Sequence, residues 1–172
     1  GNFSKLTVSV VVTKKDYTYD MLMSRIESLA KRLGITESMS KRDQVFAIYD
    51  YVNSPGKSAG NANIVFTDES NVPDIKRENW QNDWIEEAIR TIDSGEGDCY
   101  SYYSVSKAFF EYFGIENLGI KRDESQSNMS GTHFWLMVNI GSGNADAWYF
   151  YDATRLGGKY ADKTNNGCLR TY

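Results

Sequence analysis

Three residues of types that cooperate in nucleophilic catalysis occur in the order Cys99, His133 and Asp152. A thiol becomes a strong nucleophile when a base removes its proton and a third group holds that base in place. His133 is the only histidine in the chain, so it is the only histidine that can serve as this base. The residue types therefore predict a nucleophile, a base and an orienting carboxylate, if the fold brings the three side chains together.

Cys99 opens a helix predicted over residues 99–113, directly after the sharp break Gly95-Glu96-Gly97-Asp98. Unpaired backbone N–H groups and the positive end of the helix dipole favour a thiolate at such a position. The same N–H groups could stabilise an oxyanion formed when the thiolate attacks a carbonyl. Because Cys99 begins the apolar stripe of this helix, its side chain is expected to face the protein body. An inert buried cysteine is the alternative interpretation.

The segment Thr132-His133-Phe134-Trp135-Leu136-Met137-Val138 is apolar on both alternating faces, which indicates a central strand covered on both sides. The midpoint between positions 133 and 152 falls between Ser142 and Gly143, in a Gly- and Ser-rich turn. In a symmetric antiparallel hairpin, His133 and Asp152 would be directly opposite each other, with Cβ atoms about 5 Å apart. The carboxylate would then bind one imidazole nitrogen and leave the other for the thiol. The alternatives are a hydrogen-bonded core histidine and an aspartate that only starts a turn.

The elements that must position these residues change in kind along the chain. Hydrophobic periodicity predicts four helices and then three strands: helices over 20–33, from after Ser40 to Val52, 80–93 and 99–113, and strands over 115–122, 132–140 and 146–152. Gly34 is expected to end the first helix and Ser40 with Asp43 to cap the second. Helices followed by antiparallel strands predict an α+β domain.

Two further segments lie outside this succession. Residues 5–13 are rich in β-branched residues and are expected to form a strand or linker. The long polar segment 55–78 is expected to lie near the active site, because long loops in compact domains often have functional roles.

Composition narrows the class of protein. The 172 residues fit one domain, here 1–172, with 41% apolar and 24% charged residues, as in a folded globular protein. A net charge of −4 gives no reason to expect a nucleic-acid partner. No apolar run is long enough for a transmembrane helix, so membrane insertion is not expected. The sequence begins at Gly1 without Met, and we expect it to be a trimmed or mature fragment.

Three motifs resemble those of the transglutaminase-like superfamily, and the likeness covers residues from about 40 to 155. Gly97-Asp98-Cys99-Tyr100-Ser101-Tyr102 resembles the nucleophile helix, His133-Phe134-Trp135 the histidine strand, and Trp148-Tyr149-Phe150-Tyr151-Asp152-Ala153-Thr154 the aspartate strand. Upstream, Ala47-Ile48-Tyr49-Asp50-Tyr51-Val52 resembles the helix that precedes the core in bacterial members.

The resemblance implies a papain-like core in which N-terminal helices, including the Cys99 helix, pack on a C-terminal antiparallel sheet. It also implies acyl transfer or hydrolysis through a thioester on Cys99, as in peptidases, amidases and transglutaminases. The implied partners are peptides, proteins or cell-wall glycopeptides, with no cofactor or metal, at an extracellular or cell-surface location. Trp84 and Tyr100 are the positions expected to support the oxyanion hole.

Two other functions stay open. A non-catalytic cell-surface binding module could keep this fold, and a Cys99–Cys168 disulfide would favour it by consuming the nucleophile. A metal site built from Cys99, Cys168 and His133 is less favoured because the spacings match no zinc pattern. The substrate, the choice between hydrolysis and cross-linking, and the oligomeric state are not indicated by the sequence.

Overall fold

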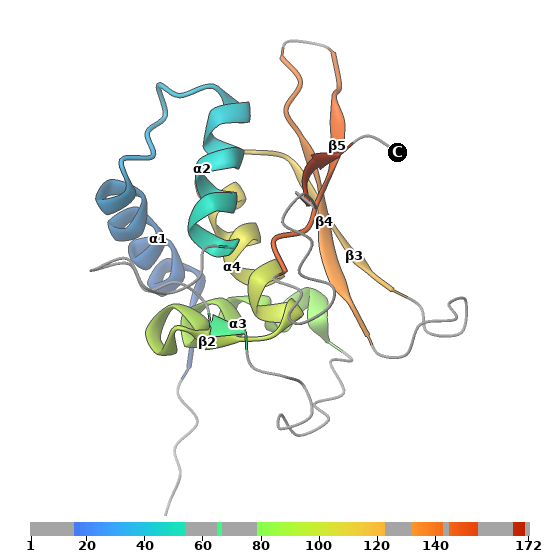
Figure 1. Cartoon of the computed structure of the whole chain (residues 1–172). Coiled ribbons are helices and arrows are strands. Elements are labelled where there is room, and N and C mark those ends of the chain that lie inside the picture. Colours follow the sequence, from blue (N-terminus) through green and yellow to red (C-terminus); the bar gives the residue numbers. More distant parts are fainter. Residues whose placement is uncertain are drawn as a thin grey trace, which may run out of the picture.

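The computed structural model describes residues 16–53, 65–66, 79–122, 132–142, 145–154 and 167–170. Within these residues the chain forms an α+β arrangement of four helices and an antiparallel four-stranded sheet. The helices lie on one side of the sheet (Figure 1). The α+β class predicted from the sequence is therefore confirmed. The strand expected over 5–13 lies outside the described residues.

The helices begin and end within one residue of the predicted boundaries: α1 spans Tyr19–Leu33, α2 Lys41–Asn53, α3 Trp80–Ser94 and α4 Cys99–Tyr112. The predicted helix boundaries agree with the structure because they are set by local interactions. Gly34 takes a left-handed conformation, with φ of 69°, and its N–H bonds to the last turn of α1. The Ser40 hydroxyl accepts a hydrogen bond from the Asp43 N–H, as expected of a residue that caps a helix.

Helix α4 is buried on nearly every side, whereas its sequence pattern predicted one buried stripe. The buried positions are Cys99, Tyr100, Ser101, Tyr102, Tyr103, Ser104, Val105, Ser106, Ala108, Phe109 and Phe110. The reason is the place of α4 in the fold: it packs against α1, α2, α3 and strand β4. Small serines on the polar positions allow this close approach, so the helix that begins with Cys99 is the centre of the domain.

The sheet has the order β3-β4-β5-β6, and every neighbouring pair is antiparallel. Its strands are β3 (Asn117–Lys121), β4 (Phe134–Asn139), β5 (Trp148–Tyr151) and β6 (Cys168–Arg170). Strand β4 is internal, as its apolar pattern predicted. Its second face is only half-buried, at Trp135 and Met137, so the expected cover on both sides is incomplete. Strand β6 was not predicted.

The β4–β5 hairpin has a register two residues away from the predicted one. Leu136 pairs with Tyr151, and Asn139 pairs with Trp148. By this register Asp152 lies opposite Trp135 rather than opposite His133. A shift of two residues keeps every side chain on its own face of the sheet, because side chains alternate with a period of two. His133 and Asp152 are therefore diagonal neighbours on one face, which is within reach for long side chains.

Asn139 accounts for this register. Its side-chain oxygen accepts hydrogen bonds from the N–H groups of Gly141 and Ala147, each at 3.0 Å. Its amide nitrogen donates to the carboxylates of Glu116 at 3.0 Å and Asp146 at 2.8 Å. These bonds fix where β4 ends and β5 begins, so the turn is not the symmetric one that the Gly and Ser residues suggested.

A short parallel pair, β1 (Val65–Phe66) with β2 (Glu96–Gly97), lies on the helical side of the domain. Part of the long polar segment 55–78 is thereby held against the residues that directly precede Cys99. The remainder of that segment lies outside the described residues.

Replacing Asn139 with alanine removes four hydrogen bonds at a residue that is 6% exposed. We expect the free energy of unfolding to fall by about 1–3 kcal/mol, since the buried partners lose their bonding group. Urea unfolding followed by tryptophan fluorescence measures the change.

Ser104→Ala is the matched control, because the buried Ser104 hydroxyl has no hydrogen-bond partner in the described part of the chain. Its loss should leave stability unchanged or slightly higher. Equal effects of the two substitutions would contradict the role assigned to Asn139.

Candidate active site

Cys99 is the first residue of α4 and is only 3% exposed. Its side chain faces the protein body, as predicted. The Sγ atom lies 3.7 Å from the backbone carbonyl oxygen of Thr132, a distance that suits a weak S–H donor. Because Thr132 directly precedes His133, this contact brings the thiol to the start of β4.

His133 and Asp152 are in direct contact, although neither belongs to a regular strand. The Nε2 atom of His133 is 2.7 Å from Oδ2 of Asp152, and the two side chains are 21% and 19% exposed. The structure therefore brings together the imidazole and the carboxylate that the sequence paired. The contact is diagonal, since the register differs from the expected one.

The Asp152 carboxylate makes a second hydrogen bond with its other oxygen. Oδ1 accepts from the N–H of Thr154 at 2.9 Å, which is the turn-starting role named as the alternative for this residue. Asp152 therefore contacts His133 and starts a turn at the same time. The turn fixes the rotation of the carboxylate, so that Oδ2 is presented to His133.

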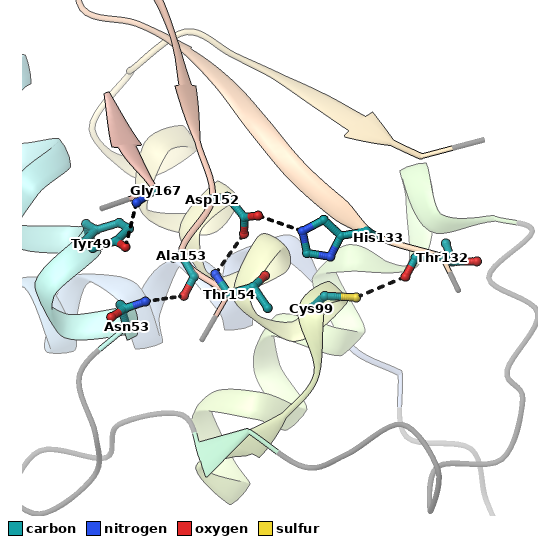
Figure 2. Close-up of polar contacts among 9 residues, drawn as sticks. All are labelled: Tyr49, Asn53, Cys99, Thr132, His133, Asp152, Ala153, Thr154 and Gly167. Atoms are coloured by element: carbon teal, nitrogen blue, oxygen red, sulfur yellow. Dashed lines mark hydrogen bonds and ion pairs between the residues drawn. The ribbon is translucent and has the colours of Figure 1, made fainter. Parts of the chain in front are cut away.

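The ring of His133 has a different neighbour on each side (Figure 2). One nitrogen, Nε2, points to Asp152, and the other, Nδ1, faces the side on which Cys99 lies. In the tautomer that carries its proton on Nε2, this N–H donates a hydrogen bond to the carboxylate and Nδ1 keeps a free lone pair. In that tautomer Nδ1 can accept a proton from the thiol. The indole of Trp135 stacks on the ring, with centroids 5.7 Å apart.

Asp98 caps the N-terminus of α4. Its Oδ1 accepts hydrogen bonds from the N–H groups of Tyr100 at 2.9 Å and Ser101 at 3.3 Å. These two donors were among those that the sequence suggested for an oxyanion. Asp98 also places a buried carboxylate next to Cys99, and its charge opposes the effect of the helix dipole on the thiolate.

The cap is itself held by α3. The Ser101 hydroxyl accepts from the N–H of Asp98 at 3.1 Å and forms a short hydrogen bond with the carboxylate of Glu87. Gly97 is required here, because a Cβ at that position would come within 2.2 Å of the Cβ of Ser101. The start of α4, and with it the backbone of Cys99, is fixed from both sides.

Comparisons with protein-family models, with curated proteins and with solved structures give no match to this chain. Within the described residues, no three His, Cys, Asp or Glu side chains lie close enough together to hold a metal ion. None of the helices in the described ranges is long and apolar enough to cross a membrane.

Cys168 is not bonded to Cys99, and both residues are thiols. Cys168 lies in β6 and is 6% exposed. Burial raises the pKa of its thiol to about 12; the carboxylate of Asp50 adds to this effect and the guanidinium of Arg42 opposes it. The disulfide that would have favoured a binding module is absent from the structure.

The two residues expected to support an oxyanion hole have other contacts. The ring of Trp84 packs edge-on against Tyr19, and the ammonium of Lys107 lies 5.1 Å from its centre. Lys107 is eight residues from Cys99, about 12 Å along the helix. The Tyr100 hydroxyl donates to the carbonyl of Trp80 at 2.7 Å. These contacts favour core packing for both Trp84 and Tyr100, which was the alternative interpretation of Trp84.

Sequence reasoning did not identify several residues that shape this site. Asp98 could have been recognised as a helix cap, because aspartate before a helix is a common signal. Thr132 contacts Cys99, Tyr49 binds Gly167 and Asn53 binds Ala153, and each of these contacts joins distant parts of the chain. No local sequence pattern indicates these long-range contacts.

The two thiols should differ in reactivity although both are buried. At pH 7.5 a thiol with a pKa of about 12 is almost wholly protonated, so iodoacetamide should modify Cys99 well before Cys168. Modification of Cys168 should rise about tenfold per pH unit up to its pKa. Peptide mass spectrometry measures both rates, and protein unfolded in urea provides the equal-reactivity control. Equal rates in the folded protein would contradict the assignment.

Asp98→Asn keeps an oxygen that can cap α4 but removes the negative charge next to Cys99. We expect iodoacetamide to modify Cys99 about two- to tenfold faster at pH 7, because the thiolate is no longer opposed by that charge. Asp83→Asn, at an exposed position in the first turn of α3, changes the net charge equally and is the control. A rate unchanged by Asp98→Asn would show that this charge does not act on the thiol.

Proposed function

We propose that this chain is a cysteine-dependent acyl-transfer enzyme or hydrolase that acts on peptide or amide substrates. Cys99 is the nucleophile, His133 the general base and acid, and Asp152 the residue that orients the imidazole. The observation that carries the proposal is the 2.7 Å contact between His133 Nε2 and Asp152 Oδ2, with the Cys99 thiol at the adjoining residue Thr132. The proposal includes a papain-like, transglutaminase-like core.

The chemistry follows from the two ring nitrogens. Rotation of the S–H bond from the Thr132 carbonyl toward the ring lets Nδ1 of His133 take the thiol proton, while Nε2–H stays bonded to Asp152. The thiolate attacks the substrate carbonyl carbon and forms a tetrahedral oxyanion. The imidazolium then gives its proton to the leaving amine as the C–N bond breaks, which leaves a thioester on Cys99.

The thioester is resolved by a second nucleophile. Water attack gives a carboxylic acid and completes hydrolysis, whereas attack by an amine gives a new amide and completes acyl transfer. His133 takes the proton of the incoming nucleophile in either case, and Cys99 leaves as the thiol. Both outcomes use the same three side chains, so the second substrate decides between them.

The substrate class that suits this chemistry is a peptide, a protein or a cell-wall glycopeptide, and we place the enzyme outside the cell or at its surface. This part of the proposal rests on the motifs around Cys99, His133 and Asp152. The two thiols are compatible with either a reducing or an oxidising compartment, because they do not pair with each other.

A binding module that retains this fold is the second candidate. The observation in its favour is the burial of Cys99, which is 3% exposed, because a substrate carbonyl must reach Sγ for any reaction to occur. Reactivity of the thiol toward a small acylating reagent separates the two functions.

The decisive measurement is the trapping of an acyl-enzyme. Incubation with p-nitrophenyl acetate should transfer the acetyl group to Cys99 Sγ with release of p-nitrophenolate, and mass spectrometry should find the acetyl group on the Cys99 peptide. His133→Ala should slow this step by about 10²–10⁴-fold, because the proton acceptor is lost. Peptides and cell-wall fragments are then tested in the same way.

Cys168→Ser is the control, since its thiol should contribute nothing to acylation. An adduct that forms equally fast in the wild-type protein and in His133→Ala would remove the case for catalysis. A complete lack of adduct on Cys99 would favour the binding module.

A further inference from the structure

Asp152 lies one residue beyond the end of β5, so the strand ladder alone does not hold it. The backbone N–H of Asp152 donates to the carbonyl of Gly167 at 2.8 Å, directly before the short strand β6. The β5–β6 pairing is irregular at this point, because the register shifts between Phe150 and Tyr151. The position of the carboxylate therefore depends on what holds Gly167.

Gly167 is held by α2. Its N–H donates to the hydroxyl of Tyr49 at 3.1 Å, while its carbonyl accepts from Asp152. A side chain at Gly167 is excluded, because a Cβ there would lie 2.1 Å from the carbonyl oxygen of Asp152. The peptide of Gly167 thus connects the Tyr49 hydroxyl to the backbone of Asp152 through two hydrogen bonds.

A second side chain of α2 binds the chain on the other side of the carboxylate. The amide of Asn53 donates to the carbonyl of Ala153 at 3.0 Å, and Ala153 is 3% exposed. Tyr49 and Asn53 are four residues apart, so they lie on one face of the helix, one turn from each other. Figure 2 shows Tyr49 directed toward Gly167 and Asn53 directed toward Ala153, next to Asp152.

We propose that Tyr49 and Asn53 are positioning residues that keep the Asp152 carboxylate at His133. The proposal rests on the function proposed above. The two α2 side chains fix the backbone before and after the point where Asp152 extends toward the ring. Neither residue touches the reacting atoms; each acts through Asp152.

Tyr49 and Asn53, here called the α2 clamp, lie on a helix that also contacts other parts of the site. Helix α2 also packs against α4, whose first residue is Cys99. The ring of Tyr49 meets the ring of Tyr151 edge-on, with centroids 5.7 Å apart, and so supports the end of β5. One helix thereby sets the positions of the nucleophile's helix and of the orienting carboxylate. Small displacements of such groups can have large effects on rate.

The test uses Tyr49→Phe, Asn53→Ala and the double variant in the full chain. Phenylalanine keeps the ring contact with Tyr151 and removes the hydroxyl that accepts from Gly167. The first readout is the rate of Cys99 modification by iodoacetamide at pH 7, followed on the Cys99 peptide. We expect it to fall about three- to tenfold in each single variant and further in the double variant.

The second readout is the His133 ring itself. Because the chain has one histidine, ¹⁵N-histidine labelling gives a single set of ring signals after removal of any purification tag. The Nε2–H proton, held by Asp152, should exchange with water about three- to tenfold faster in the variants. This measurement does not require a substrate and is made only on folded protein.

Tyr51→Phe is the matched control, because it makes the same substitution on the same helix at a hydroxyl that bonds to Arg32 instead of the sheet. It should change neither readout. A cycle with Asp152→Ala tests the mechanism: residues that act through Asp152 should have no further effect once the carboxylate is gone.

The outcomes separate this proposal from the function on which it rests. If Asp152→Ala slows Cys99 modification but the α2 variants do not, the clamp is wrong and the catalytic assignment stands. The clamp is also wrong if the α2 variants slow the reaction equally in the Asp152→Ala background. If neither His133→Ala nor Asp152→Ala slows modification, the proposed function itself fails, whatever the α2 variants do to the Nε2–H proton.

Discussion

The contact between His133 Nε2 and Asp152 Oδ2 is the interaction on which the rest of the site depends. Both side chains are about four-fifths buried, and polar groups in such a position need partners because water no longer solvates them fully. The contact satisfies both groups and also decides which ring nitrogen faces Cys99. The hairpin, the turn after Asp152 and the clamp from α2 all act to keep this one distance short.

The sequence predicted the helices closely, because their limits are set by local chemistry such as the left-handed Gly34. It predicted that His133 and Asp152 share a face, and this holds because the observed register differs from the expected one by two residues, which leaves every side chain on its own face. It did not predict the register, which is set by four hydrogen bonds of Asn139. Strand β6 was missed because its three residues carry no pattern and depend on β5 and α2 for their conformation.

The start of α4 shows that two requirements compete for the same donors. A helix needs its first N–H groups satisfied, and Asp98 satisfies those of Tyr100 and Ser101. The donors that bind Asp98 cannot also bind a substrate oxygen without breaking the cap. The same carboxylate opposes a negative charge on Cys99. The cap thus stabilises the helix and leaves less stabilisation for a thiolate, so in the proposed mechanism the imidazole must activate Cys99.

The side chains of the proposed site come from distant parts of the chain. The thiol comes from α4, the imidazole from the residue before β4 and the carboxylate from the residue after β5, while α2 binds the backbone around the carboxylate. In the proposed mechanism the imidazole, rather than the helix dipole, activates the thiol, so the carboxylate that orients the ring must also be held in place. Because the β5–β6 pairing is irregular, hydrogen bonds from a helix supply the rigidity that a longer ladder would provide. The three side chains meet only after the helices have packed on the sheet, so the proposed reactivity depends on tertiary packing rather than on any one motif.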